Sequence, residues 1–143
     1  MTPYRIQEAD LLIPSEWSDK SLNIFNIPRN NDAGEASFLI TRDTHDKNKS
    51  FEDYLSLQLQ QSKAQLPEFQ LKKNERFNFQ ETQCGWFEYT WSNGTSVLYI
   101  RQVFYALGTK ILVSTLTTTP KDVDYHDANW RKVMSSLKLL PLP

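Results

Sequence analysis

The residue types that most often carry catalysis or bind metals are few and dispersed in this chain. Its two histidines, His45 and His126, each lie in a polar segment, and the nearest pairing of ligand types is His126 with Asp122, four residues earlier. A metal site needs several ligands at defined spacing, so we expect both histidines at the surface and no bound metal. The single cysteine, Cys84, has no neighbouring histidine or lysine to lower its pKa, which indicates an inert thiol and not a nucleophile.

Other sequence features of enzymes are missing as well. The chain has no nucleophile elbow, no zinc-protease helix and no close pair of carboxylates, and its four glycines form no glycine-rich phosphate loop. We expect the dispersed glutamates at solvated edge positions: Glu68, Glu75, Glu81 and Glu88. These observations predict a protein that is not an enzyme and that needs no cofactor.

Length, composition and charge limit the remaining classes. The 143 residues, 39% of them hydrophobic and 13% aromatic, predict one folded domain over 1–143. A formal charge of −1 argues against binding to nucleic acid. No apolar run approaches the roughly 20 residues of a membrane span, which predicts no direct membrane insertion. The opening residues lack the features of a signal peptide, so we expect a cytoplasmic protein.

Glutamines form an unusual stripe on the first expected helix. A capping sequence at Ser50 and apolar residues at helical spacing predict a helix over 51–66, ended by Pro67. Beside its core stripe runs a second, uncharged one, made of Tyr54, Gln58, Gln61 and Gln65. Uncharged amides next to an apolar surface suit a partner with a bare apolar segment, because no charge has to be desolvated. A solvated face of good helix formers explains the stripe equally well.

The segment 96–106 predicts a strand that is apolar on both faces. Alternation places Leu98, Ile100, Gln102 and Phe104 on one side, and Val97, Tyr99, Arg101, Val103 and Tyr105 on the other. A chain of this size can cover one sheet face with its own helices more easily than two. We therefore expect a partner on the second face, where Gln102 would meet it with a hydrogen-bonding group.

The remaining elements predict an α+β fold. The Asn93-Gly94 pair indicates a hairpin with a type I′ turn between strands 85–91 and 96–106, and a third strand over 110–116 completes an antiparallel meander. A closing helix is expected after an N-cap at Thr119, with Val123, Trp130, Val133, Met134 and Leu137 on its buried side. Earlier strands are expected over 4–13, 22–27 and 36–41, with weaker ones over 69–71 and 75–79. The architecture is a twisted antiparallel meander sheet with two main flanking helices.

The order and spacing of these elements resemble the DcrB-like family, and especially its Eag branch, the effector-associated chaperones of bacterial type VI secretion. The resemblance begins with an acidic residue, an apolar strand, Pro14 and Trp17, followed by Asp19 and the strand at Leu22. It continues through 38–43, the helix 51–66 and the hairpin into Arg101-Gln102, and ends with Trp130 in the last helix. It therefore covers nearly the whole chain, although no single motif is diagnostic.

The resemblance implies a PsbP-like sheet, an intertwined homodimer and a concave apolar surface. Family members bind the N-terminal, transmembrane-helix-containing region of a cognate effector before secretion, keep it soluble and help to load it onto the secretion spike. The positions that match the family's groove residues are Leu22, Ile24, Gln58 and Gln102.

Membrane physics suggests how such a groove would work. A transmembrane helix in water exposes about 20 apolar residues, and a groove can replace lipid around it. We expect the apolar lining from Leu22, Ile24, Leu98, Ile100 and Phe104, with Gln58 and Gln102 bonding to polar groups of the helix. Two alternatives stay open: a structural or adaptor dimer without a hydrophobic client, and a small-molecule carrier or enzyme that uses a tryptophan-rich pocket.

Overall fold

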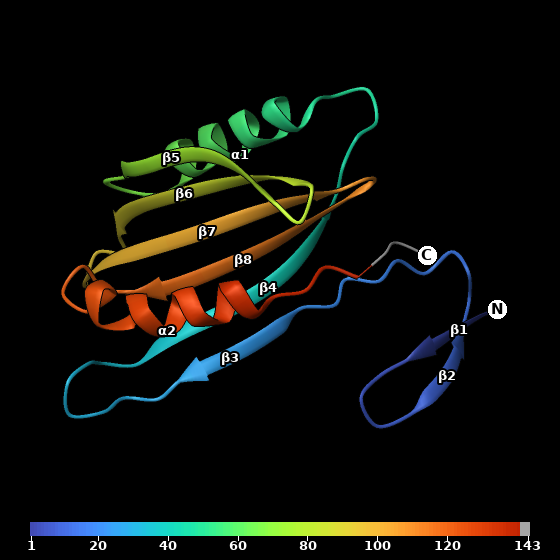
Figure 1. Ribbon diagram of the computed structural model, residues 1–143, viewed down its shortest axis with the longest axis horizontal. Coiled ribbons are helices and arrows are strands. Elements are labelled where there is room, and N and C mark those ends of the chain that lie inside the picture. Colours follow the sequence, from blue (N-terminus) through green and yellow to red (C-terminus); the bar gives the residue numbers. More distant parts are fainter. Residues whose placement is uncertain (141–143) are drawn as a thin grey trace.

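A computed structural model describes residues 1–140 as a six-stranded antiparallel sheet with one helix on each face and a two-stranded arm (Figure 1). The elements are β1 (Thr2–Arg5), β2 (Asp10–Ile13), β3 (Asn23–Ile27), β4 (Ala36–Thr44), α1 (Phe51–Gln65), β5 (Gln70–Phe79), β6 (Thr82–Ser92), β7 (Val97–Leu107), β8 (Lys110–Thr118) and α2 (Val123–Ser136). The strand order in the sheet is β3-β4-β8-β7-β6-β5. The expected α+β class, meander and two flanking helices are confirmed.

The two faces of β7 are both covered by the chain itself. Ile100 and Phe104 belong to a core cluster with Leu55 of α1, whereas Val103 and Tyr105 belong to a second cluster with Trp130 of α2. The expectation that a partner covers the second face of this strand is therefore wrong at β7. On the α1 side, exposure increases away from β7, toward β8, β4 and β3.

Helix α1 begins and ends where its sequence predicts. The Ser50 hydroxyl accepts a hydrogen bond from the Asp53 backbone N–H at 3.0 Å, which caps the first turn. Leu55 is fully buried, and it lies over Gly85 of β6 so closely that a Cβ at Gly85 would be 2.7 Å from its Cδ1 atom. Glycine at this position lets the helix approach the sheet.

Several expected boundaries differ from the structure. The expected first strand is a hairpin, β1–β2, which turns at residues 6–9, and the two weak strand segments are one strand, β5, with a bulge between Leu71 and Lys73. At the β6–β7 turn only Gly94 has a positive φ, so the turn is not type I′; the Asn93 side chain instead accepts from the N–H groups of two following residues.

The start of α2 also differs, because the N-cap residue is Asp122 and not the expected Thr119. The helix begins at Val123, and the Asp122 carboxylate accepts the Gly34 backbone N–H at 3.1 Å instead of capping its own helix. Val133, expected on the buried side, is about half exposed, whereas His126 is buried, which corrects its expected surface position.

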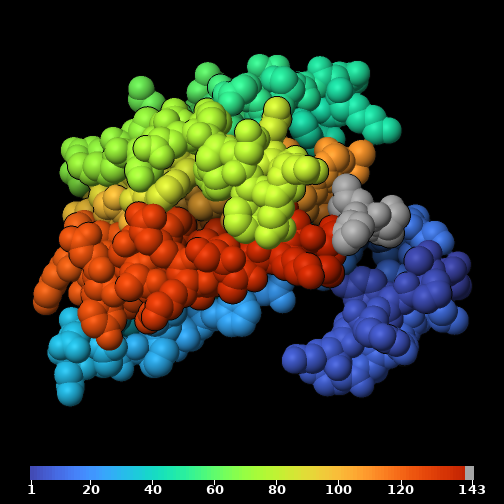
Figure 2. All heavy atoms as spheres, in the orientation of Figure 1, coloured from blue at the N-terminus to red at the C-terminus, as the bar shows by residue number. Residues whose placement is uncertain are grey.

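The N-terminal arm stands apart from the sheet. β1 and β2 pair with each other and not with the six-stranded sheet, and the arm (dark blue) lies to one side of it in Figure 2. Leu12 and the linker residue Trp17 are both 64% exposed. An isolated two-stranded hairpin is marginally stable in water, so this arm lacks the cover that its apolar side chains need.

Candidate functional site

One cross-strand row on the α1 side of the sheet brings together two of the expected site residues. Gln102 of β7 is paired with Thr115 of β8, Thr115 with Leu39 of β4, and Leu39 with Ile24 of β3. Residues paired in register lie on the same face of a sheet. The Gln102 Nε2 atom donates to Thr115 Oγ1 at 3.2 Å, so the amide is oriented by its neighbour and its Oε1 atom is left to accept from another molecule.

The row continues into a larger surface, which we call the open face. It consists of the α1-side residues of β8, β4 and β3, with Gln102 at its edge: Ile24, Asn26, Ser37, Leu39, Thr41, Thr115 and Thr117. All of these side chains are half-buried or exposed, and none of them is charged; the one charged α1-side residue of β4, Asp43, lies at the far end of the strand, where it accepts a hydrogen bond from Tyr54. This combination offers apolar contact and hydrogen bonds without requiring a partner to bury an ion pair.

The uncharged stripe of α1 meets the β4 strand at its first residue, Tyr54. The Tyr54 hydroxyl donates to Asp43 Oδ2 of β4 at 2.8 Å, which directs this side of the helix toward β4. Burial, together with the Asp43 carboxylate, raises the pKa of Tyr54, so its hydroxyl keeps the proton that it donates. Gln58 follows one turn later on the same side and is half-buried.

The structure separates the expected apolar lining into two groups. Ile24 is 66% exposed, Leu22 is 51% exposed in the linker just before β3, and Leu98 is half-buried at the β7 end of the face. Ile100 and Phe104, however, are only 5% and 2% exposed and lie in the core beneath α1. These two residues therefore support the sheet and do not offer surface to a client, which corrects their expected role.

The hydroxyl-bearing residues of the open face were missed in the sequence. Ile111, Val113, Thr115 and Thr117 lie on the same face of β8. Ile111 and Val113 are buried, whereas Thr115 and Thr117 are half-buried. A change from apolar to hydroxyl-bearing residues along one face of a strand indicates that the helix no longer covers that face. That change is visible in the sequence.

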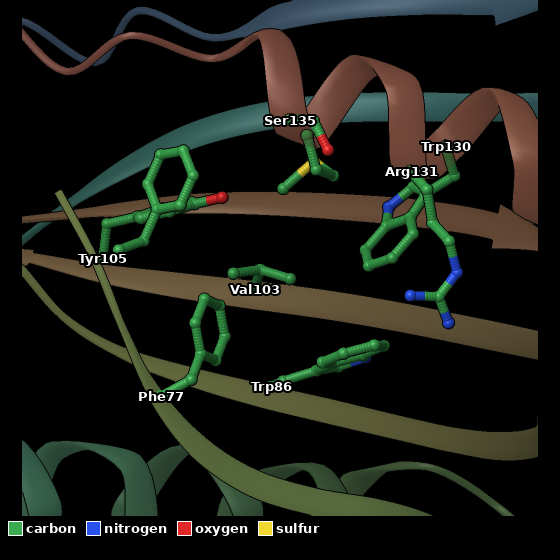
Figure 3. Close-up of a pocket in the computed structure, with 9 residues that line it drawn as sticks. Phe77, Trp86, Val103, Tyr105, Trp130, Arg131 and Ser135 are labelled. Atoms are coloured by element: carbon green, nitrogen blue, oxygen red, sulfur yellow. The ribbon is translucent and has the colours of Figure 1, made fainter.

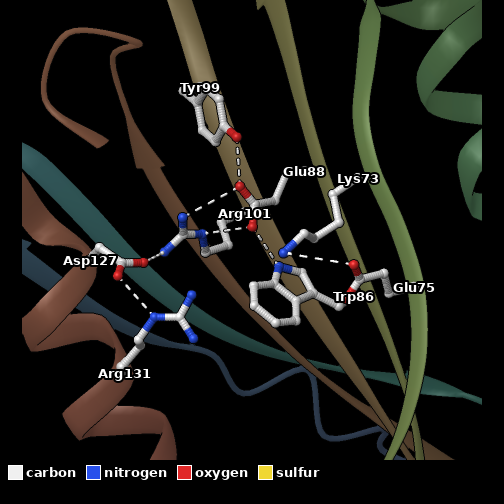
Figure 4. Close-up of polar contacts among 8 residues, drawn as sticks. All are labelled: Lys73, Glu75, Trp86, Glu88, Tyr99, Arg101, Asp127 and Arg131. Carbon is white, nitrogen blue, oxygen red and sulfur yellow. Dashed lines mark hydrogen bonds and ion pairs between the residues drawn. The ribbon is translucent and has the colours of Figure 1, made fainter. Parts of the chain in front are cut away.

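The α2 side of the sheet carries a buried ionic network (Figure 4). Arg101 Nε lies 3.0 Å from Glu88 Oε2, and Arg101 Nη1 donates to Asp127 of α2 at 2.8 Å. The Glu88 carboxylate also accepts from Trp86 Nε1 and the Tyr99 hydroxyl. Glu88 is thus buried and not at a solvated edge, as expected from sequence, because every partner that a buried carboxylate needs is present.

Two apolar hollows lie on the same side. One, of about 260 Å³, is lined by aromatic residues of the sheet and by α2, including Phe77, Trp86, Tyr105 and Trp130 (Figure 3). The other, of about 600 Å³, lies between α2 and the β3–β4 hairpin, with Phe25 and Val133 at exposed positions. The charged and polar lining of both hollows comes from α2: Arg131 and Ser135 in the first, and His126, Asn129 and Lys132 in the second.

Reactive groups are sparse in the part of the chain that the structure describes. Burial raises the pKa of the Cys84 thiol to about 12, as expected for an inert cysteine. Within residues 1–140 no three His, Cys, Asp or Glu side chains gather as metal ligands would. Across the same residues, no helix has the length and apolar character that crossing a bilayer requires.

Comparison with known proteins identifies the family of this chain. The model of the DcrB family matches residues 8–136. A Pseudomonas aeruginosa protein named Effector EagT6 is 41% identical over 143 residues, which covers all of this chain and 99% of that protein. The crystal structure of PA94, a Pseudomonas aeruginosa protein of unknown function, superposes with a TM-score of 0.90 at 40% identity, over 99% of both chains.

A more distant structure shares the fold alone. Cyanobacterial PsbP (CyanoP) from Synechocystis superposes with a TM-score of 0.57 at 11% identity, over 97% of this chain and 92% of that one. The expected PsbP-like fold is thereby confirmed. From the match over nearly its whole length, the chain belongs to the DcrB family and, within it, to the Eag branch.

Proposed function

We propose that this protein is a cytoplasmic chaperone of bacterial type VI secretion, which binds the N-terminal transmembrane-helix region of a cognate effector and helps to load it onto the spike. The name of the relative Effector EagT6 supports the association with an effector. The observation that carries the proposal is the uncharged row Ile24–Leu39–Thr115–Gln102. Gln58 of α1 is half-buried on the same side of the helix as Tyr54, which bonds to β4. The role is binding; no catalytic step is assigned to it.

The chemistry of the open face suits a membrane helix as client. Such a helix exposes about 20 apolar residues, and burying them gains roughly 25 cal/mol per Å². Ile24, Leu39 and Leu22 offer apolar contact. Gln58 and Gln102 offer amide groups of the kind that hold membrane helices together, and the Oε1 atom of Gln102 is free to accept from a client hydroxyl.

The client site is completed in our proposal by a second copy of the chain. One sheet presents only half of a concave surface, whereas two open faces can enclose a helix. The arm β1–β2, with exposed Leu11 and Leu12, and the apolar hollow between α2 and β3 supply complementary surfaces for an intertwined homodimer. The hollow is on the α2 side of the sheet, so an arm that docks there does not cover the open face.

Co-expression with the effector's N-terminal region tests the proposal. Each lost hydrogen bond is worth about 0.5–1.5 kcal/mol, so the double variant Gln58→Ala/Gln102→Ala should retain about tenfold less effector on co-purification. The matched control is Gln60→Ala/Gln83→Ala, which also removes one glutamine from α1 and one from a strand, at exposed positions outside the site. Equal recovery with both double variants would show that the open face is not the client site.

A further inference from the structure

Beside the Gln102 row, the open face contains a second polar row that ends in a hollow. Thr117 of β8 is paired with Ser37 of β4, and Ser37 with Asn26 of β3. These three side chains, together with Leu98 and Glu35, line a hollow of about 300 Å³. Within residues 1–140 none of the three has a hydrogen-bond partner, although each carries an oxygen that accepts.

The three side chains are half-buried or exposed, so their oxygens can reach a bound partner. The hollow therefore gathers accepting oxygens that are not used by the part of the chain that the structure describes.

The charge of the hollow indicates which end of a client helix these oxygens would bind. Hydroxyl and amide side chains can both donate and accept, but the carboxylate of Glu35 at the rim only accepts, and it is the one charged group in the lining. The first turn of a helix has four backbone N–H groups without intrahelical partners and the positive end of the helix dipole. The last turn presents carbonyl oxygens and the negative end, which Glu35 would repel.

The position of Glu35 is fixed by contacts outside the open face. The neighbouring Gly34 N–H is bound by Asp122 at 3.1 Å, and Asn30 Nδ2 of the same loop donates to the Tyr125 hydroxyl of α2 at 2.7 Å. The loop between β3 and β4 is thus attached to the start of α2, and the rim of the hollow is held in place before any client arrives.

We propose that this hollow receives the N-terminal end of the client's apolar helix and so sets the direction in which the helix lies on the open face. The inference rests on the proposed chaperone function. The two polar rows are two residues apart along each strand, about 6–7 Å, and a helix rises about 6 Å over four residues. A helix that starts at the hollow and follows the strands therefore presents its next turn to Gln102.

A model peptide of defined direction tests the inference. The probe is a synthetic peptide of about 20 residues, built from leucine and alanine with one central serine, and labelled with a nitroxide at one end. In isotope-labelled full-length protein, the N-terminal label should broaden the amide signals of Ser37 and Thr117, and the C-terminal label should leave them sharp. The variant Glu35→Lys should weaken binding by about two- to fivefold and reduce the preference for one direction.

The controls distinguish a failure of the assigned helix direction from a failure of the proposed chaperone function. Glu81→Gln removes an exposed carboxylate from the β5–β6 turn and should change neither affinity nor direction. If the peptide binds but both ends broaden Ser37 and Thr117 equally, or the C-terminal end does so more, the assigned direction is wrong and the chaperone function stands. If the peptide does not bind to the wild-type protein, the chaperone function fails and the inference fails with it.

Discussion

Arg101 and Gln102 are neighbours on β7 whose side chains lie on opposite faces of the sheet, and they do different work. Arg101 is buried between Glu88 and Asp127 on the α2 side, whereas Gln102 donates to Thr115 on the open face. In our proposal, stability and client binding are thus assigned to adjacent residues. This separation allows variants that affect one property without the other.

Removing the charge of Glu88 should destabilise the fold strongly. Glu88→Gln leaves the Arg101 guanidinium buried with a weaker partner, and breaking a buried ion pair costs about 3 kcal/mol or more. Urea unfolding followed by tryptophan fluorescence measures this loss. The control Glu75→Gln, at an exposed position, should change the free energy of unfolding by less than about 0.5 kcal/mol. Similar stabilities for the two variants would contradict the structural role of the network.

Acid should weaken the attachment of α2 through Asp127. Its hydrogen bonds, first with Arg131 and then with Arg101, hold the pKa of Asp127 below its ordinary value. A carboxylate with a lowered pKa in the folded state stabilises the fold above its unfolded pKa of about 3.9, and this contribution is lost as the pH falls through the lower, folded value. The difference in unfolding free energy between wild type and Asp127→Asn should therefore be constant above about pH 5 and shrink below pH 4.

The matching control for acid sensitivity lies in the arm. The pKa of Asp10 is also lowered, by its hydrogen bonds with Arg5, but that pair is exposed and far from the core. Asp10→Asn should leave the pH dependence of global unfolding as in the wild type. If it instead behaves like Asp127→Asn, the effect is not specific to the α2 network.

Gly85 and Leu55 should show coupled effects on stability. Gly85→Ala places a methyl group against the Leu55 side chain and should cost about 1–3 kcal/mol, and Leu55→Ala leaves a cavity and should cost about 2–5 kcal/mol. Because the added methyl group partly fills that cavity, the double variant should be at least about 1 kcal/mol more stable than the sum of the two single losses. Additive losses in a double-mutant cycle would mean that the two side chains do not meet.

The Cys84 thiol should react only when the protein unfolds. Burial and a pKa raised to about 12 leave almost no accessible thiolate at pH 8. A chromogenic disulfide reagent should therefore label Cys84 slowly in buffer and rapidly in urea. Ser56→Cys, which adds an exposed thiol on α1, provides the fast reference in the folded protein. Labelling of Cys84 at that reference rate would show that the β6 strand opens without global unfolding.

Deleting residues 1–13 should convert the proposed dimer into a folded monomer. The arm contributes little to the core, so the unfolding midpoint at low concentration should change little, while light scattering should show half the mass. The exposed residue Trp17 reports on the same contact in the full chain: its emission should shift toward the red when the dimer is diluted apart. A monomeric wild-type protein would remove the dimer from the proposal and leave the open face as a single-copy site.

The regular elements were predictable because each has a local physical signal. Ser50 and Pro67 mark the limits of α1, and strict alternation assigns the two faces of β7. The boundaries that failed depend on distant residues. α2 begins after Asp122 and not after the expected Thr119, and the Asp122 carboxylate binds Gly34, which is remote in sequence. Glu88, expected at a solvated edge, is buried because Arg101 meets it in space.

The candidate site was predictable only in part, for a related reason. Gln102 was chosen from strand alternation and by resemblance, and Ile24 by resemblance alone. The row that joins them exists because β4 pairs with β8, a pairing without a sequence signal. The same parity that grouped Ile100 and Phe104 with Gln102 could not tell how far α1 extends over the face. Alternation predicts on which face of the sheet a side chain lies. Whether that side chain is buried depends on where the helix packs.

The pairing of β4 with β8 also determines how late in synthesis the proposed client site can form. Strands β5 to β8 form a meander of neighbours, but β3 and β4 must wait for β8, which is made almost last. Contacts between distant segments form late because loop closure costs entropy. A ribosome-bound chain therefore has no assembled open face until nearly all of it has been translated. If the open face is the client site, as we propose, a partly synthesised chain cannot yet bind an effector.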